Sequence, residues 1–581
     1  MEKDFKGCEK FPMPLENRWQ LNKQFKPRML CGPILMASLV GASYAGQDVA
    51  VQPAGATPAP ASMAQAAPLI DSGKVEPITI RSVDVQGYTL LSEASVQEVL
   101  RPFVDTALNP DALHAMSNAL MQAYERAGYA GVVAYAPPQK LDNGHVQLRI
   151  VEGHLSRLEI ETTSHTDEAN VRNSLPALRE GKPVSLTQIN TELDVANENP
   201  NKRTLVTLKP GEAQGDIVAH VTVVDAAAWS GSLGTDNSGS GESGRLRVKG
   251  SASYTNLFDR DQSLSAQFTV APQHPALANL FYGGYTAPIY SLGLLVGGYV
   301  AESHSAVGTL QTPAGPLNYS GDTTSYGLFV TRLLPRVGNY AQRISMALGG
   351  RQSRNECEIA GSSDVCGNSA VSYRLTPLSL SYSASYATVD DKISAMGVVA
   401  LSHNIPTGGM GSQTQLDMVR PGASGSYTIL SAQGTFRVGR PNEAHLDANV
   451  AMQRASSPLV SSDAFHAGGM ASVRGYDEGE LAGDNGVSAT VQLYTPAWEA
   501  FGGAIQGLGF VDSAHAANRD GALCDVRHLR SACNLLSTGV QLSWSSGKSW
   551  RAQAALARAM VSGPATDAGT WRVLLAASYL F

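Results

Sequence analysis

Arg474 and Asp512 each lie in a distinctive stretch of sequence, and arginine and aspartate side chains can form strong ion pairs. Arg474 belongs to a segment rich in glycine and serine, within the run Val473-Arg474-Gly475-Tyr476. Asp512 ends a strand-like pattern further along the chain, shortly after Phe510. A planar guanidinium can donate two parallel hydrogen bonds to one carboxylate. The hypothesis that Arg474 and Asp512 pair in this way depends on where the fold places the two segments.

Residue sets for catalysis or metal binding are not recognisable in the sequence. No nucleophile, base and orienting residue occur together, and His466 and His515 are interpreted as polar lumen or loop residues. The acidic pairs Asp390-Asp391 and Asp477-Glu478 lack further candidate ligands nearby in the sequence. We expect no enzyme activity, no cofactor and no metal, with a Ca²⁺ site in the loops as the alternative.

Four of the six cysteines form two closely spaced pairs. The members of each pair are nine positions apart: Cys357 with Cys366, and Cys524 with Cys533. In an oxidising compartment, such spacing favours two local disulfides. A zinc site is the alternative, but the sequence has neither C-x-x-C spacing nor suitable histidines beside these cysteines.

The N-terminal residues have the features of a targeting sequence. Basic residues precede a short apolar core at 29–40, and Ser43-Tyr44-Ala45 supplies the small residues that a signal peptidase needs. We therefore predict a signal peptide over 1–45. Residues 46–77 are rich in alanine and proline and are interpreted as a linker, with a short plug helix as the alternative.

The composition of the chain favours β-structure after residue 229. Charged residues make up 16% of the chain and hydrophobic ones 43%, yet no long uncharged apolar run follows the N-terminus, which argues against membrane-spanning helices. The net charge of -7 gives no reason to expect nucleic-acid binding. Abundant glycine, serine, alanine and threonine suit an outer-membrane barrel, whose signal per strand is weak.

Two successive α+β modules are predicted before the β-rich region. In the first, strands at 78–85, 131–136 and 145–151 enclose helices at 92–104 and from 110 to Gly128, and Leu113, Met116, Leu120 and Tyr124 lie on one apolar stripe. The second has the same order, with its strands and helices at 155–161, 170–178, 186–198, 203–208 and 216–224.

From Trp229 onward, apolar and polar residues alternate with the period of a strand. Segments 245–254, 263–270, 536–544 and 571–581 show the pattern most clearly. One face would meet lipid and the other a polar lumen. At roughly 22 residues per strand and connection, the region to Phe581 predicts about sixteen strands, with long external loops at 304–320, 355–370, 405–423, 456–485 and 513–534. A soluble sandwich is the alternative, but aromatic strand ends and the terminal Phe581 favour a membrane barrel.

Short motifs in both modules carry a resemblance to a known family. They are, in chain order, Gly128-Tyr129, Pro137-Pro138-Gln139, Asn143-Gly144, Val151-Glu152-Gly153, Asn197, Asn199-Pro200-Asn201, Pro210-Gly211 and Gly215-Asp216. With them the chain resembles the two-partner secretion transporters (TpsB family, haemolysin and filamentous-haemagglutinin exporter type). The resemblance implies a POTRA domain at 78–153, a second at 154–226, and an antiparallel outer-membrane β-barrel of about sixteen strands at 227–581.

The resemblance also assigns a role to Arg474 and Asp512. In such transporters the sixth external loop, here 456–485, folds back into the lumen, and its arginine pairs with an aspartate on the barrel wall. Asp512 has the parity of an inward-facing residue, as do Leu508 and Phe510. The wall motif of the family usually ends in glycine, whereas Ala514 occupies that place here.

The function implied is export of a large haemolysin-like or adhesin-like exoprotein from periplasm to cell surface without ATP. The unfolded client would add a strand to an open sheet edge of a POTRA domain. The implied partners are this client, outer-membrane lipid and the barrel-assembly machinery, and the implied location is the Gram-negative outer membrane. A barrel-assembly insertase of the same superfamily is the first alternative, and a porin or an outer-membrane enzyme such as a lipase is the second.

Overall fold

The computed structural model describes residues 78–581, apart from 141–143, 163–164, 240–243, 313–314, 360–361, 363–365, 367–369 and 548, and describes 307–319 by backbone alone. The predicted signal peptide and linker therefore lie outside the described residues. None of the described helices is long and apolar enough to cross a membrane.

Module 1, residues 78–153, is a three-stranded sheet with two helices. Its elements are β1 Ser82–Gln86, α1 Glu93–Leu100, η1 Arg101–Phe103, α2 Pro110–Arg126, β2 Val133–Tyr135 and β3 His145–Val151. The sheet order is β1-β3-β2. The Ser92 and Asn109 side chains accept hydrogen bonds from backbone N–H groups in the first turns of α1 and α2. The predicted stripe of α2 is buried against the sheet, with Met116, Leu120 and Tyr124 all fully buried.

Module 2, residues 154–226, repeats this plan. Its elements are β4 His154–Glu161, α3 Glu168–Ser174, α4 Leu186–Ala196, β5 Lys202–Pro210 and β6 Asp216–Asp225, with sheet order β4-β6-β5. The helix predicted at 170–178 is displaced toward the N-terminus. Asp167 caps it by accepting from the Asn170 N–H, and Leu175, with φ −126° and ψ 60°, leaves the helical conformation.

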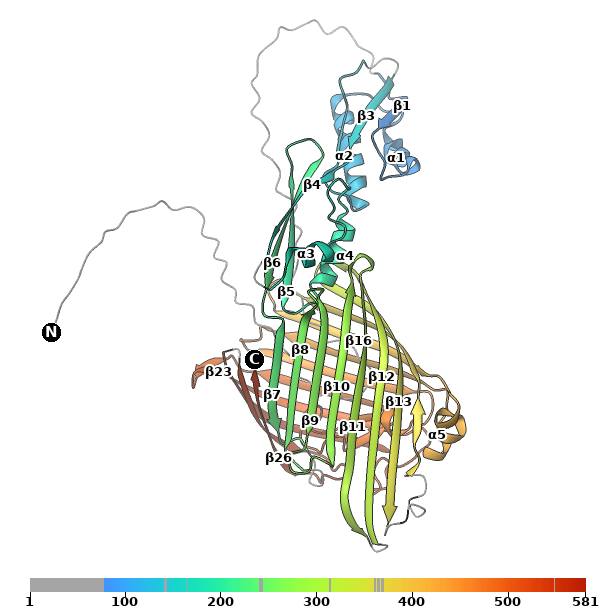
Figure 1. Cartoon of the computed structure of the whole chain (residues 1–581), viewed down its shortest axis with the longest axis vertical. Helices are drawn as coiled ribbons and strands as arrows, with labels where there is room; N and C mark the ends of the chain where they lie inside the picture. The colour runs from blue at the N-terminus through green and yellow to red at the C-terminus, as the bar shows by residue number, and fades with distance from the viewer. Residues whose placement is uncertain are drawn as a thin grey trace, which may run out of the picture. The chain divides into compact units, whose positions relative to one another are not determined.

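The remaining strands form a closed antiparallel barrel (Figure 1). They are β7 Trp229–Asp236, β8 Arg247–Leu257, β9 Gln262–Val270, β10 Ala278–Ile289, β11 Leu294–Thr312, β12 Gly315–Val337, β13 Tyr340–Ile359, β14 Tyr373–Leu375, β15 Pro377–Ala387, β16 Ile393–Asn404, β17 Thr428–Val438, β18 His445–Ala455, β21 Asn485–Tyr494, β22 Trp498–Ala500, β23 Gly503–Ala517, β24 Ala532–Ser546, β25 Trp550–Ala559 and β26 Trp571–Leu580. Since β14 continues as β15 and β21 continues as β22, the described residues make sixteen strands around the ring. The predicted fold class is confirmed.

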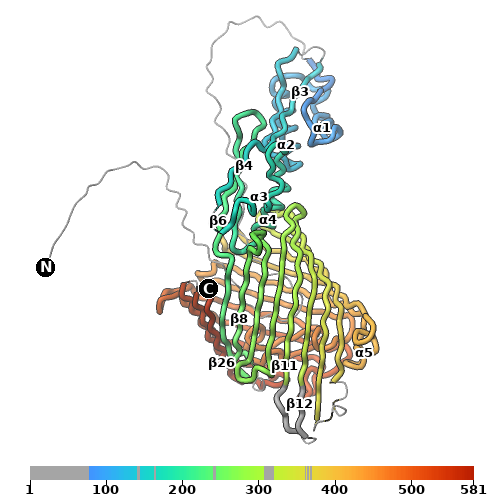
Figure 2. Tube along the Cα trace, in the orientation of Figure 1, coloured from blue at the N-terminus to red at the C-terminus, as the bar shows by residue number. Residues whose placement is uncertain are grey.

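The first and last strands close the ring. β26 pairs with β7 from Ala576–Asp236 to Leu580–Ser232. The Gly231 and Phe581 backbones then exchange two hydrogen bonds of 2.9 and 3.0 Å. Figure 2 traces the chain from the blue module 1 through the teal module 2 and the green first barrel strands to the red β26. The C-terminal residue is thus part of the barrel seam.

Two predicted loops are shorter than expected because the hairpins extend further. The predicted loop 304–320 is largely strand, since β11 and β12 remain paired up to Thr312 and Gly315. The predicted loop 513–534 shrinks to 518–531, because β23 and β24 pair up to Ala517 and Ala532. In both hairpins the backbone N–H and C=O groups form hydrogen bonds with the neighbouring strand rather than with water.

Candidate functional site in the barrel lumen

Loop 6 connects β18 to β21 and occupies residues 456–484. It contains η6 Ser461–Asp463 and a two-stranded ribbon of β19 Phe465–Ala467 with β20 Leu481–Gly483. The chain between these short strands, 468–480, carries the predicted run 473–476. The ribbon therefore presents the Arg474 segment as one folded unit.

Arg474 and Asp512 lie in direct contact. Arg474 Nε donates to Asp512 Oδ2 at 2.9 Å, and Nη2 donates to Oδ1 at 2.8 Å. The Arg474 backbone N–H also donates to Oδ2, at 3.1 Å. The two side chains are 6% and 0% exposed, so the pair is withdrawn from solvent. A bidentate pair with a third, backbone hydrogen bond fixes both the position and the orientation of the loop.

Neighbouring wall residues complete the surroundings of this pair. The guanidinium carbon of Arg474 lies 3.4 Å from the Phe510 ring centroid, in a cation–π arrangement. Ser537 Oγ donates to Asp512 Oδ2 at 3.3 Å, and Arg474 Nη1 donates to Gln541 Oε1 at 3.3 Å. With the Gln492 amide oxygen turned toward the guanidinium, Arg474 Nη2 donates to it at 2.9 Å. The ion pair is therefore held by three adjoining barrel strands.

The other residues of the run pack against the same wall. Val473 and Tyr476 are fully buried in a cluster with Leu535, Ala514 and Ala559. The Tyr476 hydroxyl donates to the Val561 carbonyl at 2.7 Å and accepts from the Leu536 N–H at 3.2 Å. This explains how Ala514, where the family usually has glycine, is accommodated: its methyl group belongs to the packed cluster.

Gly475 is required by the closeness of the loop to the wall. A Cβ at this position would lie 2.8 Å from the Ser537 Cβ and 3.0 Å from the Ala559 backbone nitrogen. Such distances are shorter than normal contacts and involve backbone, which does not move aside easily.

A second anchor of loop 6 was missed by the sequence analysis. Asp484, at the end of loop 6, is fully buried and accepts two hydrogen bonds from Arg420, at 2.6 and 2.9 Å. It also accepts from the backbone N–H groups of Leu459 and Arg519, at 2.8 and 2.9 Å. Arg420 follows α5 Gln413–Val419, so this carboxylate joins three separate loops. No local pattern marks such a contact.

Loop 6 has a further contact at its beginning. Asp463 forms an ion pair with Arg351 of β13 and accepts a hydrogen bond from the Tyr427 hydroxyl. Loop 6 is therefore held near its start by Asp463, at its tip by Asp512 and at its end by Asp484.

The structure joins the cysteines as Cys357–Cys366 and Cys524–Cys533. His515 Nδ1 lies 2.8 Å from Asn534 Oδ1, and His466 Nε2 lies 3.1 Å from the Ser461 carbonyl oxygen. Among the described residues, no cluster of three or more His, Cys, Asp or Glu side chains could hold a metal ion.

The predicted motif residues of module 1 lie at its joint with module 2 and at a sheet edge. The Gly128 carbonyl accepts from the Leu186 N–H at 2.7 Å, and Tyr129 forms a β-bridge with Ser185. A Cβ on Gly153 would lie 2.5 Å from the Ala130 carbonyl oxygen, so only glycine fits there.

Gln139, just after the bend at Pro138, substitutes for a strand partner. Its side-chain amide exchanges two hydrogen bonds of 2.7 Å with the backbone of Gln147 on β3. Glu152, beside Gly153, accepts from the Thr89 and Leu90 N–H groups at 2.7 and 2.8 Å. Although burial opposes it, these hydrogen bonds lower the pKa of Glu152.

In module 2 the motif residues occupy turns. Pro210 ends β5, and the Gly211 N–H donates to the Asp216 carbonyl at 2.8 Å across the β5–β6 turn. Asn199 and Pro200 lie between α4 and β5, and the Asn199 side chain contacts the barrel turn between β8 and β9. The structure thus gives Asn199 a contact outside its own module.

Comparisons with known proteins agree with this architecture. A family model described as haemolysin secretion/activation protein ShlB/FhaC/HecB matches residues 215–519, and a model of the ShlB-type POTRA domain matches 78–153. The outer membrane transporter CdiB of Dickeya dadantii (strain 3937) is 22% identical over 451 residues, which are 76% of each chain. The hemolysin transporter protein ShlB of Serratia marcescens is 27% identical over 45% of this chain and 46% of its own length.

Solved structures share the fold. CdiB from Escherichia coli superposes with a TM-score of 0.70 at 20% identity, covering 89% of this chain and 93% of that one. CdiB from Acinetobacter baumannii gives 0.67 at 17% identity with the same coverage.

Proposed function

Because this chain belongs to the ShlB/FhaC/HecB family of haemolysin secretion/activation proteins, we infer that it is an outer-membrane transporter that exports an exoprotein by two-partner secretion. The observation that carries this function is a closed sixteen-strand barrel preceded by two α+β modules, with loop 6 fastened to the wall by a buried ion pair. Barrels of this size enclose an aqueous channel rather than a packed core. The chain is a secretion channel, and catalysis has no part in the proposal.

The periplasmic modules would receive the client by strand addition. In module 1 the edge strands are β1 and β2, and in module 2 they are β4 and β5. An edge strand presents unpaired backbone groups to an extended peptide, and pockets beside it can read alternate side chains. Folding of the client outside the cell, or its one-way release there, would drive export without ATP.

The client is proposed to be a large exoprotein encoded beside this gene. Relatives are named outer membrane transporter CdiB, hemolysin transporter protein ShlB and heme/hemopexin transporter protein HuxB. Lipid at the apolar outer face and the barrel-assembly machinery during insertion are the other proposed partners. Val511 and Val540, on neighbouring strands, are 50% and 60% exposed on this outer face.

Deletion of residues 78–153 tests the proposal. The barrel ladder closes on itself without module 1, so we expect a folded, inserted barrel that no longer exports the neighbouring exoprotein. Heat-modifiable migration of the barrel in gels and immunodetection of secreted exoprotein are the two measurements. Export by the truncated protein would refute the role of the modules. Loss of other outer-membrane proteins from the membrane on gene deletion would instead support the insertase alternative.

A further inference from the structure

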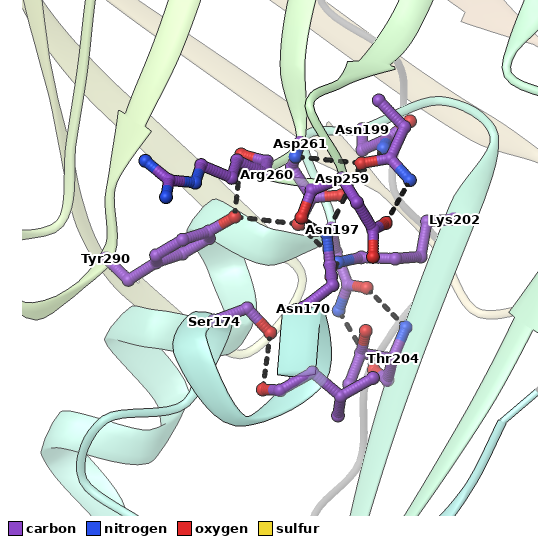
Figure 3. A network of polar contacts seen from close by, with 12 residues as sticks. Asn170, Ser174, Asn197, Asn199, Lys202, Thr204, Asp259, Arg260, Asp261 and Tyr290 are labelled. Carbon is purple, nitrogen blue, oxygen red and sulfur yellow. Dashed lines mark hydrogen bonds and ion pairs between the residues drawn. The ribbon is translucent and has the colours of Figure 1, made fainter. Parts of the chain in front are cut away.

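We propose that Lys202 of module 2 and Asp261 of the barrel are positioning residues for export, which hold the start of strand β5 at the periplasmic turn between β8 and β9. The proposal rests on the proposed function and adds to it the contact that places a candidate client-binding edge at the barrel. The contact is buried, and it is drawn in Figure 3.

On the barrel side, Asp261 ends a tight turn with unusual backbone geometry. Phe258, Asp259 and Asp261 have positive φ angles of 58°, 51° and 53°, which side chains other than glycine rarely adopt. Asn256 supports the turn, because its Oδ1 accepts from the Asp261 N–H at 3.0 Å. Strained conformations of this kind persist where surrounding contacts hold them. Contacts such as that between Asn256 and Asp261 therefore help to hold this turn in its conformation.

Two groups of module 2 and one of the barrel converge on the Asp261 carboxylate. Lys202 Nζ forms an ion pair with Oδ2 and also donates to Asn170 Oδ1 at 2.7 Å. Asn199 Nδ2 donates to Oδ1 at 3.0 Å, and the Tyr290 hydroxyl, from the next barrel turn, donates to Oδ2 at 2.7 Å. Figure 3 shows these side chains pointing toward one another.

Burial makes this contact specific. The Lys202 and Asp261 side chains are each 2% exposed. A buried carboxylate is tolerated only when donors satisfy it, so the pair favours one docked geometry over a sliding interface. Burial, together with the charge of Asp261, raises the pKa of Tyr290, so its hydroxyl remains a hydrogen-bond donor.

Two other ion pairs between module 2 and the barrel are less buried. Arg343–Glu198 has side chains 17% and 27% exposed, and Arg336–Asp194 has side chains 32% and 16% exposed. These half-buried pairs are partly screened by water, so each should contribute less than the pair that is withdrawn from solvent. These pairs therefore provide matched controls from the same contact region.

The position of Lys202 in its strand links the contact to the client. Lys202 is the first residue of β5, an edge strand that pairs only with β6 among the described residues. β6 leads directly into the first barrel strand, β7. A client strand added antiparallel to β5 would run parallel to β6 and hence toward the barrel. Holding the start of β5 therefore fixes where the client strand reaches the barrel.

The test combines export with a distance measurement in the full-length protein. Lys202→Met and Asp261→Asn are compared with Arg336→Met and Arg343→Met. Spin labels are placed at Glu212→Cys in the β5–β6 turn and at Lys392→Cys in a distant periplasmic turn; the native cysteines beyond the predicted signal peptide are joined in disulfides. We expect one narrow distance distribution for the parent and both controls, and a broad distribution for Lys202→Met and Asp261→Asn.

Export should fall about tenfold or more in Lys202→Met and Asp261→Asn, because each leaves a buried charge without its counter-ion. Both controls should stay within about twofold. The double variant should lose little more than either single one, and Lys202→Arg should recover part of the export. Asp261→Asn lies outside module 2, so its effect cannot arise from a misfolded Lys202 strand.

A narrow distribution in Lys202→Met would overturn the positioning role, and so would normal export alongside a broad distribution. If the parent itself exports no exoprotein, the proposed function fails, while the distance measurement still judges the contact between Lys202 and Asp261.

Discussion

The Arg474 guanidinium and the Asp512 carboxylate form a bidentate ion pair, with donor–acceptor distances of 2.8 and 2.9 Å, inside the barrel. The pair holds loop 6 to β23 at a point where neither side chain is more than 6% exposed. The loop is therefore attached to the wall by charge, in addition to its apolar packing.

Arg474→Ala should release loop 6 and reduce export while the barrel still inserts. Removal of one partner leaves a buried charge unpaired, which costs roughly 3–5 kcal/mol in a dry site and less in a wet lumen. Arg474→Lys should also be impaired, since an ammonium group does not reproduce the bidentate geometry. Asp512→Ala should match Arg474→Ala, and the double variant should be little worse. Export and surface-protease cleavage of loop 6 are the measurements; additive defects would remove the pair from the mechanism.

Gly475→Ala should displace the tip of loop 6 without removing any charge. The new methyl group would lie 2.8 Å from the Ser537 Cβ, which calls for a backbone shift. Overpacking of this kind typically costs about 1–3 kcal/mol. Gly509→Ala is the matched control, because a Cβ there meets no atom within 4 Å. Proteolysis of loop 6 should increase only in Gly475→Ala, and equal behaviour of the two variants would refute the close-packing argument.

The modules and the barrel could be predicted because their signals are local and repeated. The stripe of Met116, Leu120 and Tyr124 recurs with the helical period, and alternation along strands such as β9 recurs with the period of two. Both patterns follow directly from backbone geometry. Strand ends were less predictable, because the extension of β11 and β12 depends on pairing between the two strands.

Contacts between distant segments left no such pattern. Arg420 and Asp484 are 64 positions apart, and Lys202 and Asp261 are 59 apart. Neither pair has a local spacing that marks it. Arg474 and Asp512 could be matched in advance only because the chain resembles a family in which such residues pair. That this pair is needed for export remains a prediction.

Removal of the two disulfides should have unequal effects. Each closes a loop with a sequence separation of 9. Chain entropy limits the stabilisation to about 2–3 kcal/mol for each. Cys533 also packs in the cluster that contains Val473 and Tyr476, whereas Cys357 does not. We therefore expect replacement of Cys524 and Cys533 by serine to increase proteolysis of loop 6, and replacement of the other pair to leave it unchanged. Equal effects would contradict this coupling.

Module 2 should lose stability as the pH rises toward neutrality. Burial raises the pKa of Glu192 from 4.5 to about 7, against the opposing effects of the Ala177 N–H and Arg179. Below pH 4.5 the carboxyl is protonated in both the folded and the unfolded state. As the pH rises from 4.5 to about 7, the unfolded state gives up this proton first, so the free energy of unfolding decreases. The loss is at most about 3.5 kcal/mol, since one pKa unit corresponds to about 1.4 kcal/mol.

Glu192→Gln should remove this pH dependence, because the amide does not ionise. Urea titrations of the full-length protein at pH 5 and pH 8, with proteolysis of module 2 as the readout, would measure it. If module 2 of the parent protein resists urea equally at pH 5 and pH 8, ionisation of Glu192 does not destabilise the folded state.

Asp484→Asn should loosen three external loops together while the tip of loop 6 stays in place. The carboxylate accepts hydrogen bonds from Arg420, Leu459 and Arg519. In asparagine one of the two oxygens becomes an NH2 group, which cannot accept from these donors. Hydrogen bonds to a charged group are worth about 1.5–3 kcal/mol each, so the loss should be measurable. Arg420→Ala should give the same phenotype, because it removes the bidentate donor of the same site.

The control is Asp567→Asn, whose side chain is 67% exposed and pairs at the surface with Arg527. External protease should cut within 405–427 and 518–531 faster in Asp484→Asn and Arg420→Ala than in the control. Cleavage confined to one of these segments would show that Asp484 does not join the loops, and release of the Arg474 segment would show that the two anchors of loop 6 are not independent.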